Sequence, residues 1–282
     1  MLNFSSLLET KRPVLRVAAN RMDAIKQMVE SGLPALAVYD KRDSFVGILS
    51  ARELLRHADE EQLGLLLEKP DPRSFANQLA DQKVLSEITN KGYSAIFDSN
   101  GRFQGIIYIE DILRKLLSKK EYEKFPIEGF VRDKFSVVWA SAPVGVGWCA
   151  LRSSGMNSLL VVDDSCKPFS VFSELDVLAE TVEERVSVRE QGGDSGVSEE
   201  WGVEQSDIVY IDRLTLTVSN RPLKTFTNKL KDTVLYTESV ASVATKMVLG
   251  RLPLLPVVDS SKNLMGVVYG VDLLKILKDN AF

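Results

Sequence analysis

A pattern of 17 residues occurs four times in this chain without a gap, and it limits the folds open to the chain more than any other feature. In each copy an Asp follows a short apolar run, and a Gly or Ser seven residues later opens a second apolar run. An acid closes the pattern after six more residues. Each copy of such an internal repeat is one supersecondary unit, so the repeat fixes the architecture. The copies begin at Ala37, Ala95, Leu160 and Pro256.

Local signals assign secondary structure to each copy. Polar clusters separate two runs rich in β-branched and aromatic residues, so each copy predicts two strands joined by a short turn. A helical pattern precedes the strands, and in the first copy Ile25, Met28 and Val29 share one helix face. A second helix follows the closing acid. The unit is therefore βαββα, and we predict a mixed α/β (α+β) fold.

The repeat resembles the cystathionine-β-synthase (CBS) domain family. The resemblance rests on the strand end at residues 256–259 (Pro-Val-Val-Asp) and on the motif glycine, apolar, apolar, Ser or Thr, two variable residues, acid. In that family two repeats associate about a pseudo-twofold axis into one module. Four repeats imply two CBS-pair modules, an organisation similar to that of the gamma subunit of AMP-activated protein kinase.

The spacing of the copies places the domain boundaries. The interval between the third and fourth copies is longer by about thirty residues, more than an ordinary connection. Residues 189–207 are rich in Gly, Ser and acids and predict a mobile surface loop, and residues 207–220 alternate β-formers as in an added strand or hairpin. We expect a first module at 1–120, with repeats at about 12–58 and 72–118, and a second at 121–282, with repeats at about 130–182 and 230–280 and an insertion at about 185–222.

Composition restricts the function classes. The chain has 282 residues, 45% of them hydrophobic, and can bury two cores of ordinary domain size. Its net charge of −4 and pI near 5.3 argue against a general nucleic-acid partner and an anionic membrane surface. Two cysteines fit a reducing compartment, and the N-terminal stretch lacks the features of a secretion signal. We therefore expect a cytoplasmic protein with no membrane segment.

The resemblance implies a ligand site at the end of each copy. In the family, the Ser or Thr of the motif contacts a phosphate or ribose oxygen of an adenine nucleotide, and the acid three residues later accepts hydrogen bonds from the ribose hydroxyls. The chemistry suits a helix start, because unpaired backbone N–H groups and the helix dipole both favour an anion there. A carboxylate one turn later can accept two hydrogen bonds from a cis-diol.

The first and third copies carry a hydroxyl at the motif position. Ser173 and Asp176 satisfy both polar positions, whereas Ser50 is followed by Glu53, which is longer than Asp by one methylene. The alternative for both copies is helix capping, because Ser followed three residues later by an acid is the signature of a helix N-cap. Both interpretations stay open.

The second and fourth copies carry tyrosine instead, at Tyr108 and Tyr269, and keep Asp111 and Asp272. A tyrosine hydroxyl projects farther than that of Ser, so the ring either blocks the phosphate position or stacks on a base. The helix dipole alone also explains an Asp in the first turn of a helix.

Two basic residues are candidates for contacts with phosphate. Arg251 precedes the second strand of the last copy, where related proteins direct a basic side chain into the cleft between repeats, and Arg152 lies on the predicted helix of the third repeat. The alternative for both is solvated surface. The candidate ligand-binding residues are Ser50, Glu53, Asp111, Arg152, Ser173, Asp176, Arg251 and Asp272.

No catalytic or metal site is predicted. The single histidine, His57, has no second His, and the cysteines are distant from it in sequence, so neither a zinc site nor a Cys/His nucleophile pair is supported. We interpret the chain as a non-catalytic regulatory, energy-sensing protein. It would bind AMP, ADP or ATP, or alternatively S-adenosylmethionine, and pass occupancy to an unidentified protein partner. A scaffold with degenerate clefts, a nucleic-acid-associated protein and a homodimer through the modules are the alternatives left open.

Overall fold

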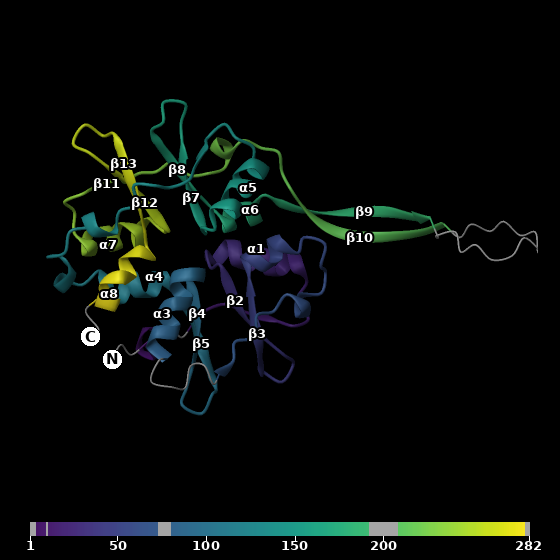
Figure 1. The fold of residues 1–282 in the computed structure, drawn as a ribbon. Coiled ribbons are helices and arrows are strands. Elements are labelled where there is room, and N and C mark those ends of the chain that lie inside the picture. The colour runs from purple at the N-terminus through teal and green to yellow at the C-terminus, as the bar shows by residue number, and fades with distance from the viewer. Residues whose placement is uncertain (1–3, 10, 73–79, 192–207, 280–282) are drawn as a thin grey trace, which may run out of the picture.

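Each copy of the repeated pattern folds as an antiparallel strand pair that leads into a helical turn (Figure 1). The computed structural model describes residues 4–9, 11–72, 80–191 and 208–279. The mixed fold class is confirmed. The strand pairs with their helical turns are β2 (Ala35–Tyr39), β3 (Phe45–Ser50) and α2 (Ala51–Arg56); β4 (Tyr93–Phe97), β5 (Phe103–Tyr108) and α4 (Ile109–Ile112); β7 (Ser158–Val162), β8 (Pro168–Ser173) and α6 (Glu174–Ala179); and β12 (Leu254–Val258), β13 (Leu264–Tyr269) and the 3₁₀ turn Asp272–Leu274.

The first acid of the pattern holds the turn between the two strands. The Oδ1 atom of Asp40 accepts hydrogen bonds from the backbone N–H groups of Arg42 (2.7 Å) and Ser44 (2.9 Å). Bonds from the residues two and four positions later recur at Asp98 and Asp163. Every strand pair also has a register shift at the strand end beside this Asp. The repeated Asp is therefore a turn residue.

A leading strand and a helix precede three of the strand pairs. Each leading strand pairs in parallel with the first strand of its repeat, so the predicted βαββα unit is confirmed in the first, third and fourth repeats. In the second repeat the segment 73–79, ahead of the helix, lies outside the described residues. The elements are β1 (Val14–Arg16) and α1 (Arg21–Ser31); α3 (Ala80–Lys91); β6 (Val137–Trp139) and α5 (Val144–Ser154); and β11 (Val234–Leu235) and α7 (Val240–Gly250).

Local sequence explains where α1 begins and ends. Asn20 caps the helix by accepting a hydrogen bond from the N–H of Asp23 (2.8 Å). Gly32 ends it at φ 69°, a left-handed conformation that glycine adopts without steric strain. Ile25 and Met28 are buried, as the predicted helix face requires.

The four repeats surround a common centre. The sheets of the first and second repeats pack together, and so do those of the third and fourth. Helices join the two pairs: α1 and α2 pack on α6, and α7 packs on the π-helical turn Leu113–Leu117. This pairing of sheets is what two modules require, and the exact module boundaries stay a prediction. Short helices at Phe4–Leu7, Leu63–Leu65, Lys120–Tyr122, Glu128–Phe130 and Leu223–Thr225 lie in the connections, and α8 spans Lys275–Asp279.

A two-stranded arm leaves the body between the third and fourth repeats (Figure 1). In it β9 (Thr181–Gln191) pairs antiparallel with β10 (Ile208–Val218). Of the two alternatives expected for residues 207–220, the structure has the added strand, β10, and its partner β9 was not predicted and begins before the predicted insertion. The prediction of a loop from residue 189 is wrong for 189–191, which continue β9 because the alternating strand pattern runs on through the charged positions. Residues 192–207 lie outside the described residues.

Arg21 fixes the base of the arm to the first repeat. Its side chain is 2% exposed, and its guanidinium donates to Oε1 of Glu183 in β9 (2.9 and 3.1 Å) and to the backbone oxygen of Leu214 in β10 (3.0 Å). It also donates to the backbone oxygens of Ala58 (2.7 Å) and Glu60 (3.1 Å). A buried cation needs such partners. The arm therefore ties the second pair of repeats to the first.

Within the part of the chain that the structure describes, no helix combines the length and the hydropathy that a bilayer crossing needs.

Candidate functional site

In the third repeat the two motif side chains bond each other at the start of α6. The Ser173 hydroxyl donates to Oδ2 of Asp176 (2.6 Å) and accepts from the N–H of Asp176 (3.4 Å), and the Ser173 N–H donates to the same Oδ2 (2.7 Å). Burial raises the pKa of Asp176, and the bonds from Ser173 oppose that rise. Among the described residues, no Lys or Arg is a partner of Asp176. Neutral donors alone hold this half-buried carboxylate.

In the first repeat a tyrosine of the second repeat lies near the buried hydroxyl. Ser50 caps α2 by accepting from the N–H of Glu53 (3.3 Å) and is 2% exposed. The Tyr93 phenol lies near Ser50 and donates to Oε1 of Glu68 (2.6 Å). Burial, reinforced by the charge of Glu68, raises the pKa of Tyr93. The Glu53 carboxylate instead pairs with Arg56 (3.3 Å), so hydroxyl and acid have separate partners.

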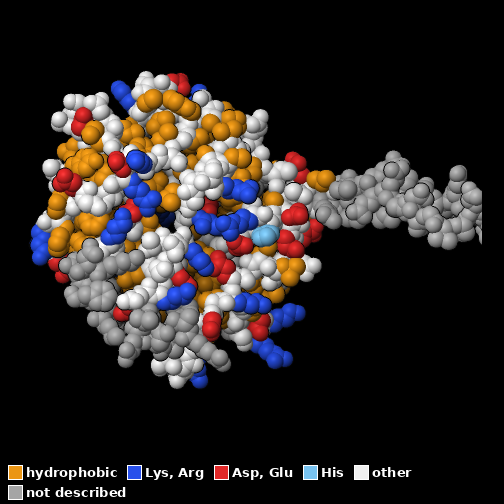
Figure 2. Space-filling model, viewed as in Figure 1, with side chains coloured by type: hydrophobic (Ala, Val, Ile, Leu, Met, Phe, Trp, Pro, Cys, Tyr) orange, Lys and Arg blue, Asp and Glu red, His pale blue; other side chains and the backbone are white. Residues whose placement is uncertain are grey.

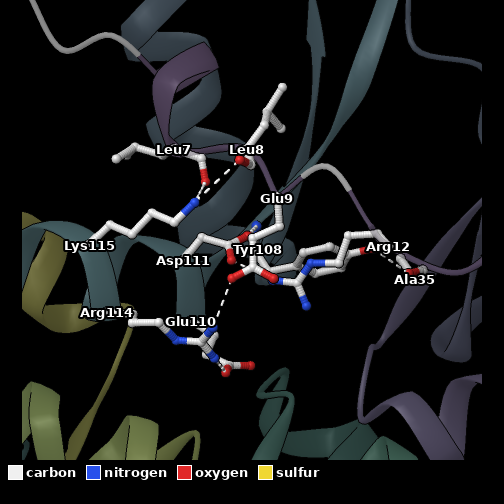
Figure 3. A network of polar contacts seen from close by, with 10 residues as sticks. All are labelled: Leu7, Leu8, Glu9, Arg12, Ala35, Tyr108, Glu110, Asp111, Arg114 and Lys115. Carbon is white, nitrogen blue, oxygen red and sulfur yellow. Dashed lines mark hydrogen bonds and ion pairs between the residues drawn. The ribbon is translucent and has the colours of Figure 1, made fainter.

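In the second repeat an arginine from near the start of the chain covers the motif acid (Figure 3). The Asp111 side chain is 0% exposed; its Oδ2 accepts from the N–H of Tyr108 (3.0 Å) and its Oδ1 pairs with Arg12. The Arg12 guanidinium lies 5.0 Å from the centre of the Tyr108 ring, and the Tyr108 hydroxyl donates to the backbone oxygen of Ala35 (2.7 Å). Burial raises the pKa of Asp111, opposed by the Tyr108 N–H and by Arg12.

The segment that carries Arg12 is fastened to the helix beyond Asp111. Lys115 donates to the backbone oxygen of Leu7 (2.9 Å), and Arg114 pairs with Glu9 (2.8 Å). Glu9 also lies 3.4 Å from Arg12. These contacts hold the arginine at the motif tyrosine and acid of the second repeat. We call the position of the motif pair in each repeat its cleft and number it by the repeat.

The fourth repeat has the same arrangement with a different arginine. Arg132 forms a two-pronged pair with Asp272, Nε to Oδ2 at 2.6 Å and Nη2 to Oδ1 at 2.8 Å. The Asp272 side chain is 4% exposed. The guanidinium lies 4.8 Å from the centre of the Tyr269 ring, whose hydroxyl donates to the backbone oxygen of Ser158 (3.4 Å). The bond to Asp272 raises the pKa of Arg132. Both tyrosine-bearing copies thus hold a guanidinium on their acid.

The glycine of the motif lets the arginine-bearing segment lie against the strand. The backbone of Arg132 bonds that of Val267 in both directions (2.8 and 3.1 Å). A Cβ on Gly266 would lie 2.7 Å from the backbone oxygen of Arg132, too close for any other residue without a shift. In the third repeat Ser170 stands at this position, and its hydroxyl donates to the Thr227 hydroxyl (2.9 Å).

The two basic candidates are not brought to the third-repeat acid. Arg152 is exposed, with its guanidinium 5.8 Å from the Trp148 ring centre. Arg251 is exposed and ends α7 at φ 51°. In the described residues, the hydrogen bonds on the Asp176 carboxylate come from Ser173.

Sequence reasoning missed Arg12 and Arg132, which do reach motif acids. Each meets its acid across a large separation, 99 residues for Arg12 and 140 for Arg132. They precede β1 and β6 at different offsets, so no fixed spacing marks them. The available signal is a basic residue ahead of each pair of repeats.

A polar link runs from the third-repeat site to the first and second repeats. Glu174, the residue after Ser173, accepts from Nε of Arg52 (2.7 Å). Arg52 also donates to the side-chain oxygen of Asn157, which in turn donates to the backbone oxygen of Lys91 (3.0 Å). Burial raises the pKa of Glu174, and Arg52 opposes the rise. Three repeats therefore meet beside Ser173.

The surface around the centre is locally basic. Figure 2 shows Lys and Arg side chains gathered around a hollow near the middle of one face, with acidic side chains among them. Such a surface can attract an anion although the net charge is −4. The described residues bring together no group of three or more side chains able to hold a metal ion, and His57 lies 3.5 Å from Glu53.

Comparison with known proteins finds relatives by sequence. The family model for the CBS domain matches residues 7–60. A curated protein of Acidianus ambivalens, described as an uncharacterized 17.7 kDa protein, is 30% identical over 118 residues. The match covers 40% of this chain and 72% of that protein.

Two solved structures share the fold along the whole chain. A Methanocaldococcus jannaschii protein, described as a proposed archaeal homologue of γ-AMPK, covers 98% of this chain and is itself covered to 100%, with a TM-score of 0.69 and 14% identity. An uncharacterized conserved protein from Pyrococcus horikoshii covers 97% of this chain and is covered to 98%, with a TM-score of 0.57 and 19% identity. At these identities the likeness concerns the fold.

Proposed function

The chain belongs to the CBS-domain family, and from that premise we propose that it is a regulatory protein that binds an adenine-containing small molecule at the third repeat. The observation that carries the proposal is the state of Asp176. Among the described residues it is the one motif acid whose partners include no cation. Ser173 stands beside it, so both polar positions of the motif are present there.

The two side chains can exchange their mutual bonds for bonds to a ligand. A ribose diol offers two donors to the Asp176 carboxylate, which then releases the Ser173 hydroxyl to a phosphate or ribose oxygen. The Ser173 N–H keeps its bond to Asp176 (2.7 Å) and so preserves the position of the carboxylate. Burial raises the pKa of Asp176, and a carboxylate in that setting gains more from hydroxyl donors than a solvated one.

The proposal also specifies the ligand and the way in which its binding is passed to a partner. The basic side chains around the central hollow favour AMP, ADP or ATP, with S-adenosylmethionine as the alternative. Glu174 and Arg52 connect the site to the first repeat (2.7 Å), so occupancy at Ser173 changes how the two pairs of repeats pack. An unidentified protein partner in the cytoplasm reads that change as a population shift.

Calorimetry with AMP, ADP, ATP and S-adenosylmethionine tests the proposal. Binding should disappear in the double variant Ser173→Ala, Asp176→Asn and persist in the matched control Ser50→Ala, Glu53→Gln. A ligand at 100 times its Kd should stabilise the wild type by about 2.7 kcal/mol. Loss of the Ser173 cap alone costs roughly 0.5–2 kcal/mol, so each variant is first melted without ligand. Unchanged affinity in a folded double variant would contradict the proposal and leave Ser173 and Asp176 as caps.

A scaffold function is the second candidate, because the motif acids of the other three repeats are each paired with an arginine. Tyr93 lies near Ser50 in the first repeat, and Tyr108 and Tyr269 each lie under an arginine in the second and fourth. Failure of all four ligands to bind the wild-type chain would favour the scaffold.

A further inference from the structure

We propose that Arg12 and Arg132 are built-in occupants of the second and fourth clefts, so that the chain binds one adenine-containing ligand although it has four copies of the motif. Each arginine holds the carboxylate that a ribose would otherwise use. The inference rests on the proposed function of the third repeat, since it concerns how many equivalent clefts share that function.

The two arginines reach the same position independently. Arg12 precedes β1 of the first repeat and acts on the second repeat, whereas Arg132 precedes β6 of the third repeat and acts on the fourth. Each guanidinium makes the same two contacts, with the motif carboxylate and with the face of the motif tyrosine. Two segments from different parts of the chain place an arginine in the same pair of contacts. This recurrence indicates that the closure is a specific feature of both clefts and not an incidental surface contact.

The pairings use the oxygens that a diol needs. Both carboxylate oxygens of Asp272 are bonded to Arg132 (2.6 and 2.8 Å). In Asp111, Oδ1 is paired with Arg12 and Oδ2 accepts from the Tyr108 N–H (3.0 Å). A ligand would have to displace a charged partner from a buried acid, and neutral ribose hydroxyls cannot replace that charge.

The first cleft is closed by other means. Ser50 is 2% exposed and lies near Tyr93, and Glu53 is paired with Arg56 (3.3 Å). This leaves Asp176 as the acid whose described partners are neutral.

The fourth cleft offers the cleaner test. Arg132 uses both Nε and Nη2 on its acid, whereas Nε of Arg12 is buried without a hydrogen-bond partner among the described residues. The closure by Arg132 is therefore the more complete. Its removal frees Oδ2 of Asp272 and leaves, among the described residues, only the mostly exposed Lys275 3.3 Å from Oδ1, so the position that is shut in the wild type should open.

The experiment counts AMP bound per full-length chain by equilibrium dialysis. We expect one for the wild type, two for Arg132→Ala, and one again for Arg132→Ala combined with Asp272→Asn, which removes the ribose acceptor. Arg221→Ala is the matched control, because Arg221 also pairs with an acid, Glu180 (3.1 Å), and lies 5.8 Å from a ring centre, that of Phe226, outside the motif clefts. The control should bind one.

The outcomes separate this inference from the proposed function. One AMP bound by Arg132→Ala, or two or more by the wild type, overturns the inference. No AMP bound by the wild type but one by Arg132→Ala overturns the third-repeat site and supports the arginine closure. No binding by either protein overturns both. If Arg132→Ala does not melt cooperatively, Arg132→Gln, which keeps more of the side-chain volume, takes its place with the same expected counts.

Discussion

The third and fourth repeats pack their sheets together, yet their motif acids have opposite surroundings. Asp272 is almost fully buried in a two-pronged pair with Arg132, whereas Asp176 is half-buried and bonded by Ser173 alone among the described residues. The two acids stand at the same position of the same pattern. The difference comes from the segment that crosses each strand, which brings an arginine to the fourth repeat and Thr227 to the third.

This comparison shows that the motif marks a cleft but does not decide its use. The acid lies in the first turn of a helical segment in all four repeats and is compatible with a ligand, a cap or an ion pair. A segment from the neighbouring repeat selects among these. Repeats that share a fold can therefore differ in function through residues outside the repeated pattern.

The largest expected effect comes from Arg132→Ala, which leaves the buried Asp272 with the mostly exposed Lys275 (3.3 Å) as its remaining charged partner among the described residues. We expect the free energy of unfolding to fall by roughly 2–4 kcal/mol, less than for a fully buried pair because Arg132 is 34% exposed. Adding Asp272→Asn should restore most of the loss. Urea denaturation at neutral pH measures both. A loss no larger than that of Arg221→Ala, an exposed pair worth up to about 1 kcal/mol, would show that Lys275 or water satisfies Asp272 without Arg132.

Gly266→Ala should have the next largest effect, because the new Cβ would lie 2.7 Å from the backbone oxygen of Arg132 and push its segment off the strand. We expect a loss of about 1–3 kcal/mol. The reciprocal change in the third repeat, Ser170→Gly, removes one hydrogen bond to Thr227 and should cost only about 0.5–1.5 kcal/mol. Equal melting temperatures for the two variants would contradict the expected difference between the segments that cross the third and fourth repeats.

A double-mutant cycle on Arg52→Ala and Glu174→Gln measures the link between the third-repeat site and the first repeat. We expect a coupling energy of about 1–2 kcal/mol, because the 2.7 Å pair is mostly shielded from water. The same cycle on the exposed pair Lys26 and Glu30 (3.9 Å) should give at most about 0.5 kcal/mol. Equal coupling energies in the two cycles would show that the Arg52–Glu174 pair does not link the third-repeat site to the first repeat.

The smallest effect is a pH dependence from Asp176. Burial raises its folded-state pKa above the unfolded value, so the folded state binds the proton more tightly. The contribution of Asp176 to stability is therefore greatest at low pH and falls as pH rises through the window between the unfolded and folded pKa values. Urea titrations at several pH values should show that the free energy of unfolding of Asp176→Asn rises relative to that of the wild type as pH increases. A relative fall with increasing pH would mean that the bonds from Ser173 outweigh the effect of burial on the pKa of Asp176.

The repeated pattern was sufficient to predict the strand pairs and their helices, because both depend on short-range periodicity. The pattern also included the turn-forming Asp40 and its equivalents, although their bonding was visible only in the structure. The roles of Arg12 and Arg132 could not be predicted, since each acts on an acid in another repeat. The arm was predicted in part, because its charged positions resemble those of a loop while its backbone continues as a strand.

The burial of Arg21 has a consequence for the order in which the chain assembles. This residue lies in the first repeat, but Glu183 and Leu214, which accept from it, follow 162 and 193 residues later. Contacts of such sequence separation form slowly, because the long loop must close before they can stabilise the fold. During synthesis the first repeat emerges from the ribosome well before the arm that completes it. A chain interrupted ahead of the arm would expose the start of α1, where a chaperone could bind, and the first repeat to be made is among the last to be finished.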